Sequence, residues 1–324
     1  MKVAIITRII DKGAGNLTPI LSAFPSKVEW KVFSSPSDIG ACTILLRHRR
    51  ELQTYDLLHI NSLICGAFNS LHLPTVCSVH TVQKTEYQLD TTFRNRVGMR
   101  FETHTVNKVD RFLTVDPSIT RDFLTNYPKV DASHVEFVRH ATLDPDVHFS
   151  TEKDPKLILA SGRLVKRKNF ELFIDLAKQL PQYNFVLVGE GNHYNELASR
   201  SRNVTNMTML PYLPRKDYCD LLSQAFVYIM TSYYEGYPTT VFEAMQAGTP
   251  VLSTKIPSMA EMVIHGQRGY YFTSPSECVK LVNMLAKYSH LYESCQTLAR
   301  DYVLSQPSAT TIANQFITVY EELL

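Results

Sequence analysis

The chain has 324 residues, 44% of them hydrophobic and 20% charged, a composition typical of a globular protein with two domains of about 150 residues each. Its formal net charge is only +2, which excludes the strong single-sign excess expected of a protein that binds nucleic acid. The six cysteines are scattered and have no histidine at ligand spacing, so reduced, buried thiols are favoured over disulfides or structural zinc.

Two apolar stretches resemble targeting or membrane segments. At the N-terminus, Arg8 interrupts a short apolar run, which favours a first strand over a signal peptide. Residues 57–83 contain no charged side chain, but histidines, asparagines and Pro74 interrupt them, which predicts a strand, a helix and a strand inside a buried sheet. We therefore expect no transmembrane segment and a cytoplasmic protein, with peripheral contact at the inner membrane surface left open.

The first half of the sequence alternates between strand-like and helix-like patterns. Short apolar runs predict strands at residues 3–7, 28–33, 55–60, 75–79, 112–115 and 135–138. Helices are predicted between them at residues 17–23, 37–49, 89–106 and 117–126, with a polar loop at 81–85. This alternation predicts a doubly wound, mostly parallel sheet.

The second half repeats the scheme, with predicted strands at 157–160, 185–188, 207–210, 226–230, 251–253 and 270–272. Two prolines and a charged run make residues 144–155 the expected linker. We therefore expect an N-terminal domain over 1–149, a C-terminal domain over 150–308 and a final helix over 309–324. That helix has an apolar face formed by Ile312, Phe316, Val319, Tyr320 and Leu323.

The stretch 231–251 carries two carboxylates where a strand gives way to a helix. Pro238 fits the first turn of a helix predicted over 239–246, which Gly248 and Pro250 end. Glu235 lies in the loop and Glu243 in the first turn, at the strand edge where open α/β sheets bind ligands. Thr240 and Glu243 also form the capping-box pattern Thr-x-x-Glu, so the residues alone allow Glu243 to be a cap or a ligand contact.

A cationic segment, Ser-Gly-Arg-Leu-Val-Lys-Arg-Lys-Asn-Phe over residues 161–170, follows the first strand of the second half. Arg163 and Lys168 can reach the same edge as Glu235. There they would neutralise a diphosphate leaving group, each contact contributing about 1.5 to 3 kcal/mol. The alternative is a solvated basic loop.

Glu235 and Glu243, with the following Ala-Met-Gln-Ala-Gly-Thr-Pro-Val, resemble the nucleotide-binding signature of the retaining glycosyltransferases of family 4. The resemblance implies that Glu235 contacts the donor sugar and that Glu243 holds both ribose hydroxyls, which suits an ionised carboxylate. It also assigns nucleotide-sugar binding to Gly236, Tyr237 and Thr239.

The same resemblance covers other motifs. Arg163 and Lys168 match the diphosphate clamp of the family, whereas Lys166 and Arg167 do not. Further contacts are implied near the phosphates for Gly15, after the first strand, and for Gly189, after a later strand. They are also implied beside the base for Pro211 and Tyr212, and beside the donor sugar for His80 at a strand end. The residues alone also explain each of these positions as an ordinary turn or polar side chain.

The resemblance implies the GT-B fold, in which two Rossmann-like domains face each other across a cleft and the final helix crosses back to the first domain. The expected activity is retaining transfer of a sugar from a UDP- or GDP-sugar to a hydroxyl acceptor, such as a glycan or a lipid-linked glycan. No cofactor and no metal ion are expected, in agreement with the GT-B pattern that the resemblance implies. The alternatives are a GT-B nucleotide-sugar epimerase and an inactive GT-B subunit that binds a partner.

Two basic segments in the first half have two interpretations, a solvated surface or a contact with anionic lipid or a phosphorylated acceptor. One segment carries Arg94, Arg96 and Arg100, and the other carries Arg47, His48, Arg49 and Arg50.

Overall fold

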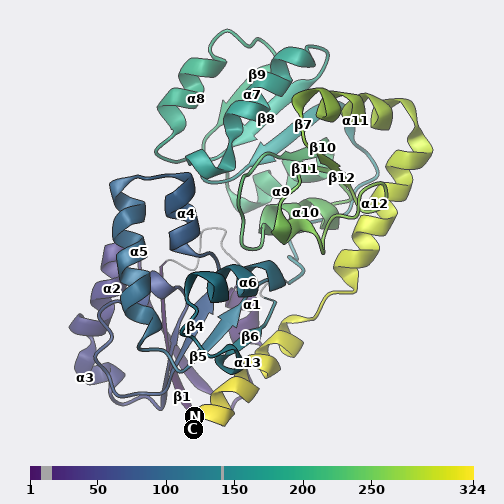
Figure 1. Ribbon diagram of the computed structural model, residues 1–324. Coiled ribbons are helices and arrows are strands. Elements are labelled where there is room, and N and C mark those ends of the chain that lie inside the picture. The colour runs from purple at the N-terminus through teal and green to yellow at the C-terminus, as the bar shows by residue number, and fades with distance from the viewer. Residues whose placement is uncertain (9–16, 140–141) are drawn as a thin grey trace. The chain divides into compact units, whose positions relative to one another are not determined.

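The structure is a computed structural model that describes residues 1–8, 17–139 and 142–324. The chain forms two units, Met1–Thr142 with Pro307–Leu324, and Leu143–Gln306 (Figure 1). The division between them lies ahead of the boundary expected at 149/150. Gly15 of the predicted glycine turn lies outside the described residues.

The first unit contains, in its described part, a six-stranded parallel sheet of order β2-β1-β3-β4-β5-β6. The central strands are buried along their whole length, which explains their continuous apolar sequences. All the strands predicted for this half are present: β1 (Lys2–Arg8), β2 (Glu29–Ser35), β3 (Leu57–Ile60), β4 (Thr75–Val79), β5 (Arg111–Thr114) and β6 (Val135–Phe137).

Two helix predictions for this unit were wrong in their bounds. The helix expected over 37–49 is divided at His48 into α2 (Asp38–Arg47) and α3 (Arg49–Leu52). The helix expected over 89–106 begins later, as α5 (Phe93–Val106), and a separate helix, α4 (Gln83–Leu89), replaces most of the predicted polar loop. Thr92 starts α5 by accepting a hydrogen bond from the Asn95 N–H, as an N-cap does. The other helices are α1 (Leu17–Ser22), α6 (Pro117–Asn126) and the 3₁₀ turns η1 (Leu63–Gly66) and η2 (Ala132–His134).

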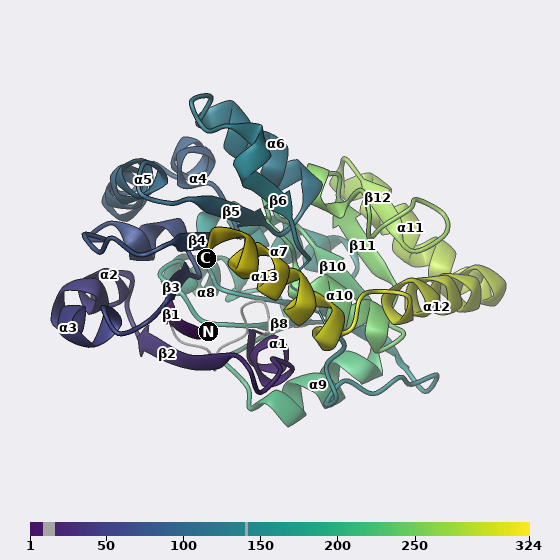
Figure 2. The same cartoon turned by 90° about the horizontal axis from the view of Figure 1, so that it is seen from below.

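The last helix, α13 (Ala309–Leu323), belongs to the first unit and packs beside α1 (Figure 2). Its apolar face enters the core of that unit, where Phe316 and Tyr320 contact the ring of His59. His59 Nδ1 lies 2.5 Å from the Tyr320 hydroxyl and Nε2 lies 2.8 Å from Ser78 Oγ. Burial lowers the pKa of His59 to about 3, so this histidine is a neutral, hydrogen-bonded core residue.

The second unit contains, among its described residues, a parallel sheet of order β12-β11-β10-β7-β8-β9. Strand β7 starts this sheet in sequence, yet it lies between β10 and β8, so the strand order reverses beside it. All the strands predicted for this half are present: β7 (Asp154–Ser161), β8 (Asn184–Val188), β9 (Met207–Leu210), β10 (Ala225–Met230), β11 (Val251–Thr254) and β12 (Tyr270–Phe272).

Helices and short 3₁₀ turns connect these strands. The predicted helix over 239–246 is confirmed as α10 (Thr239–Gln246), although Pro238 is its N-cap residue and not its first helical residue. The other elements are η3 (Lys166–Lys168), α7 (Phe170–Gln179), α8 (Tyr194–Ser201), α9 (Arg215–Gln224), η4 (Pro257–Met259), α11 (Pro275–Lys287) and α12 (Ser289–Leu304).

The segment that enters the second unit is fastened to α10. The Gln246 side-chain amide donates to the carbonyls of Asp144, at 2.7 Å, and Val147, at 3.1 Å, and its oxygen accepts from the Asp144 N–H at 3.0 Å. The three N–H donors of Lys153 match the Ser223 and Ala247 carbonyls and the Thr249 hydroxyl. The charged run predicted as a linker is therefore hydrogen-bonded to α9 and α10 at several points.

The prediction of buried, unpaired thiols is confirmed, since all six cysteines lie in the described ranges, are buried and form no disulfide bond. Within those ranges, none of the helices combines the length and apolar character needed to span a bilayer.

Candidate functional site

The loops that follow β7 and β10 meet at the point where the strand order of the second sheet reverses. The two strands are parallel neighbours, with Tyr228 opposite Leu159, so their carboxyl ends open on the same edge. In open α/β sheets, ligands bind at this switch point. The β7 loop carries Arg163 and Lys168, and the β10 loop carries Glu235.

Glu235 is the centre of a nearly buried ion cluster. Lys168 Nζ lies 2.6 Å from Oε1 and Arg167 Nη1 lies 3.1 Å from Oε2. Ser232 Oγ donates to Oε1 at 2.6 Å. The Glu235 side chain is 6% exposed, against 13% for Lys168 and 11% for Arg167. Both carboxylate oxygens are therefore engaged with protein groups.

The charges in this cluster depend on one another. Burial alone would raise the pKa of Glu235, but Lys168 and Arg167 lower it to about 2, so the carboxylate is ionised. Burial lowers the pKa of Lys168, and Glu235 opposes that shift by stabilising the ammonium. Glu235 thus holds two cations in place at the strand edge.

Arg167 is the residue of this cluster that the sequence analysis missed. Besides Glu235, its Nη1 donates to the Tyr234 carbonyl at 2.8 Å, so it anchors the β10 loop to the β7 loop. Arg163 is exposed, and its positive charge acts on Lys168. The two arginines therefore differ in burial, because Arg167 is 11% exposed and bound to the β10 loop, whereas Arg163 is exposed.

Glu243 lies in a second cluster, in the second turn of α10 and not in the first as predicted. Arg215 Nη2 lies 2.9 Å from Glu243 Oε1 and 2.5 Å from Asp144 Oδ2. The helix has no side-chain N-cap, and Thr240 Oγ1 instead accepts from the Tyr228 hydroxyl at 2.9 Å. The capping-box alternative is therefore wrong for Glu243.

Hydroxyl groups connect the two strands that precede these loops with α9 and α10. Ser161, the last residue of β7, has its Oγ 2.9 Å from the Tyr218 hydroxyl and 3.1 Å from the Tyr228 hydroxyl. Tyr218 belongs to α9 and Tyr228 to β10. With the bond from Tyr228 to Thr240, one network of hydroxyl groups thus joins β7, α9, β10 and α10.

Gly189 has a structural requirement of its own. Its φ is +157°, and a Cβ at this position would lie 1.9 Å from the carbonyl oxygen of Gly162. The loops after β7 and β8 therefore approach each other so closely that a side chain is excluded. Contact between Gly189 and a nucleotide stays a prediction.

The remaining predicted residues of the second unit lie at the same edge or in the loop before α10. Pro211 and Tyr212 follow β9 and are exposed, and the Tyr212 N–H points at Glu190 Oε1 at 3.4 Å. Gly236 is buried and Tyr237 is half-buried between β10 and α10, and Thr239 is the first residue of α10.

His80 belongs to the first unit and follows β4. Its Nε2 lies 3.1 Å from Asn61 Oδ1. Burial lowers its pKa to about 4, so it is neutral at pH 7 and can act by hydrogen bonding but not by charge. Its contact with the donor sugar stays a prediction.

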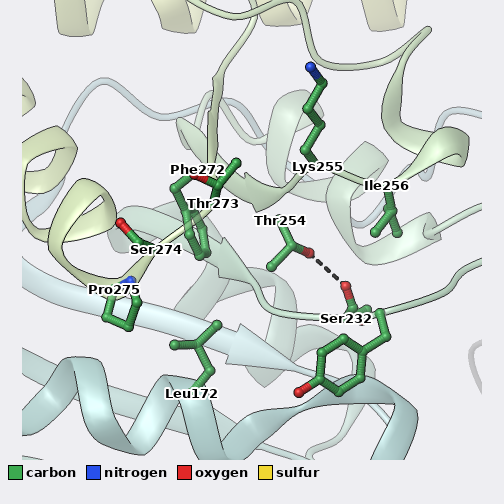
Figure 3. Close-up of a pocket in the computed structure, with 10 residues that line it drawn as sticks. Leu172, Ser232, Thr254, Lys255, Ile256, Phe272, Thr273, Ser274 and Pro275 are labelled. Carbon is green, nitrogen blue, oxygen red and sulfur yellow. Dashed lines mark hydrogen bonds between the residues drawn. The ribbon is translucent and has the colours of Figure 1, made fainter. Parts of the chain in front are cut away.

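A cavity of about 320 Å³ opens beside Glu235, between the ends of β10, β11 and β12. Its walls include Leu172, Phe272 and Pro275, with hydroxyls from Ser232 and Thr254 that are hydrogen-bonded to the protein (Figure 3). Ser232 therefore forms part of both the cavity wall and the Glu235 cluster.

Across residues 1–8, 17–139 and 142–324, one group of side chains has the spacing to hold a metal ion, namely Glu171, His193 and Glu196. Each ring nitrogen of His193 faces a different carboxylate, Nε2 at 2.6 Å from Glu171 and Nδ1 at 3.2 Å from Glu196. This is the arrangement of a histidine paired with two carboxylates, and the expectation of no metal stays a prediction.

Both halves of the chain match known families. Residues 2–141 match the model described as Glycosyltransferase Family 4, and residues 146–301 match the model described as Glycosyl transferases group 1. The Vi polysaccharide biosynthesis protein VipC/TviE of Salmonella typhi is 28% identical over 178 residues, covering 49% of this chain but only 31% of the relative. The N-acetyl-alpha-D-glucosaminyl L-malate synthase of Bacillus anthracis is 22% identical over 317 residues, covering 91% of this chain and 82% of the relative.

Solved structures share the architecture. HepE of Anabaena, solved in complex with UDP and glucose, matches with a TM-score of 0.81 at 18% identity over 100% of both chains. Two Rossmann-like units with parallel sheets define a protein of the GT-B fold. With both halves matching glycosyltransferase families, the chain is a family-4-like member of the GT-B glycosyltransferases.

Proposed function

We propose that the protein is a retaining, metal-independent glycosyltransferase that moves a sugar from a UDP- or GDP-sugar to a hydroxyl acceptor, such as a glycan or a lipid-linked glycan. The observation that carries this proposal is the cluster of Lys168, Arg167 and Glu235 at the switch point, with Arg163 exposed beside it. A departing nucleoside diphosphate carries two or more negative charges, and fixed cations at this edge would stabilise them.

Arg163, Arg167 and Lys168 would have different roles in stabilising the diphosphate. Glu235 holds Lys168 ionised and in place, and Arg167 binds the other carboxylate oxygen of Glu235, so the ammonium needs no reorganisation when charge develops on the leaving oxygen. Arg163, which is exposed, would close on the diphosphate from the solvent side. These side chains supply positive charge that a metal supplies in other transferases, which supports metal independence. Retention is inferred from the resemblance to family 4.

Glu243 would bind the ribose of the donor. Arg215 occupies Oε1, and within the described ranges no hydrogen bond reaches Oε2. The side chain is 14% exposed, so Oε2 can accept a bond from a ribose hydroxyl. HepE was solved with UDP-glucose, which makes UDP the first nucleotide to test.

Titration calorimetry with UDP, GDP and ADP in the presence of EDTA tests the donor site. Binding of one nucleotide in the micromolar range is expected without metal. Replacement of Glu243 by Gln removes the anionic acceptor and should weaken binding by about 1.5 to 3 kcal/mol, or roughly tenfold to a hundredfold. If folded wild-type protein binds none of the three nucleotides, the site is not a nucleotide site, and that result favours the inactive-subunit alternative. Conversion of a UDP-sugar to its epimer without transfer would favour the epimerase.

We also propose peripheral contact with anionic membrane through the turn between α4 and α5. Phe93 is 80% exposed and Leu89 is 44% exposed, and Arg94 and Arg96 next to them are exposed. Apolar side chains flanked by arginines suit the interface of an anionic bilayer, where each arginine contributes about 1 kcal/mol.

Flotation with phosphatidylglycerol and phosphatidylcholine vesicles tests this contact. Binding to the anionic vesicles should weaken as salt is raised, and Phe93→Ser should reduce it several-fold. Exposed Tyr194 in the second unit offers a control, Tyr194→Ser, that should leave binding unchanged. Equal binding of the wild type to both kinds of vesicle would rule out the electrostatic contact.

A further inference from the structure

Arg215 lies at the start of α9 and pairs at once with Glu243 and Asp144. Its Nη2 is 2.9 Å from Glu243 Oε1 and 2.5 Å from Asp144 Oδ2. Its guanidinium carbon lies 5.6 Å from the centroid of the Tyr218 ring, one turn along the same helix. Tyr218 is in turn hydrogen-bonded to Ser161 at the end of β7. The guanidinium is therefore fixed on several sides.

Asp144 is fixed as well, which limits where Arg215 can place its charge. The Asp144 N–H donates to Gln246, one turn beyond Glu243 on α10. Its Oδ1 accepts from the Asp146 N–H at 2.9 Å. Glu243, Arg215, Asp144 and Gln246 thus form a closed ring of contacts that begins and ends on α10.

The Glu243 carboxylate needs such a partner, because its surroundings oppose its charge. Burial raises its pKa to about 7, and the nearby Asp144 acts in the same direction, whereas Arg215 lowers the pKa. The other titratable groups whose charges couple to Glu243 come from α9 and β10, namely Tyr218, Cys219 and Tyr228. Arg215 is the cation among the groups that couple to Glu243 in the described residues.

Resting on the proposed donor site, we propose that Arg215 is its positioning residue, which keeps the Glu243 carboxylate ionised and holds Oε1 so that Oε2 accepts from the ribose hydroxyls. A neutral carboxylic acid has one acceptor oxygen fewer for the two ribose hydroxyls. Its own O–H is a donor, as the hydroxyls are, and does not accept from them. Loss of Arg215 should therefore weaken donor binding most at low pH and least at high pH.

Isothermal titration between pH 5.5 and 9 with UDP-glucose and GDP-mannose tests this inference, since the phosphates of these sugars do not titrate in that range. Wild-type affinity should fall below about pH 7, following Glu243. In Arg215→Gln the midpoint should move up by at least one pH unit, which lowers affinity about tenfold at pH 6.5, and binding should recover near pH 9. Arg215→Lys keeps the charge and should restore most of the affinity at pH 7.

Asp144→Asn distinguishes an Arg215 that positions Glu243 from an Arg215 that only stabilises the fold. It also tests the inference if Arg215→Gln does not fold. It removes the carboxylate that competes for Arg215, so the midpoint should move down and affinity at pH 6.5 should rise. Arg200→Gln, which breaks an exposed arginine–Asp175 pair in the same unit, should match the wild type throughout. Uniform weakening by both Arg215→Gln and Asp144→Asn, with no change of midpoint, would overturn the inference. If the wild type binds neither sugar nucleotide, the proposed function itself fails.

Discussion

Replacing Glu235 by Gln is expected to destabilise the protein by about 3 to 5 kcal/mol, the cost of removing one partner from a buried ion pair. Lys168 and Arg167 would then lie nearly buried without a counter-charge. Lys168 should release its proton, because burial already lowers its pKa and Glu235 is the charge that opposes this. Turnover of the donor should also fall, because the leaving diphosphate then lacks the ordered charge of Lys168.

Urea unfolding measures the effect, and its pH dependence identifies the cause. The pKa of Glu235 is about 2 in the folded protein, against an ordinary 4.5. Its stabilisation is therefore fully present above about pH 4.5 and is lost as the pH falls through 2. The free energy of unfolding of Glu235→Gln should therefore lack the fall that protonation of Glu235 causes in the wild type between about pH 4.5 and 2.

Asp175→Asn is a matched control for that substitution. Asp175 also pairs with a lysine and an arginine, Lys178 and Arg200, but these side chains are 47% and 43% exposed. Exposed pairs contribute about 0 to 1 kcal/mol, so the control should be nearly silent. If Glu235→Gln costs no more than this control, Glu235 does not hold the cluster together.

The sequence predicted the strands well because each is a short apolar run between turn residues, a signal that does not depend on distant contacts. Helix α10 was predicted for the same reason, since Pro238 and Gly248 mark its two ends. The separate helix α4 and the later start of α5 were missed because one polar pattern runs through both helices. Residues 90–92 separate them, and Thr92 caps α5.

Side-chain roles were harder to predict because they depend on pairs far apart in sequence. Arg167 lies among four cations in six residues, and nothing local distinguishes the one that reaches Glu235. Arg215 lies 28 residues before Glu243 with no pattern linking them. Thr240 and Glu243 fit a capping box in sequence, but Tyr228 and Arg215 bind their side chains instead.

Arg163→Ala is expected to lower kcat by about 10²- to 10³-fold, the effect of removing one fixed charge from the stabilisation of a developing anion. Because Arg163 is exposed, the free energy of unfolding should change by less than about 0.5 kcal/mol. The loss should appear mainly in kcat, since the charge on the leaving oxygen grows only in the transition state. Release of UDP from UDP-glucose under single-turnover conditions measures it.

Lys166→Ala provides the comparison within the same loop. Lys166 is also exposed but does not match the family clamp, so its removal should change kcat less than threefold. A general electrostatic effect of the basic loop would instead give the two variants similar losses, both relieved by raising the salt concentration. A specific contact predicts a large loss for Arg163 alone that persists at high salt. Arg163→Lys should then recover only part of the rate, because a point charge cannot make the two parallel bonds that a guanidinium makes to phosphate oxygens.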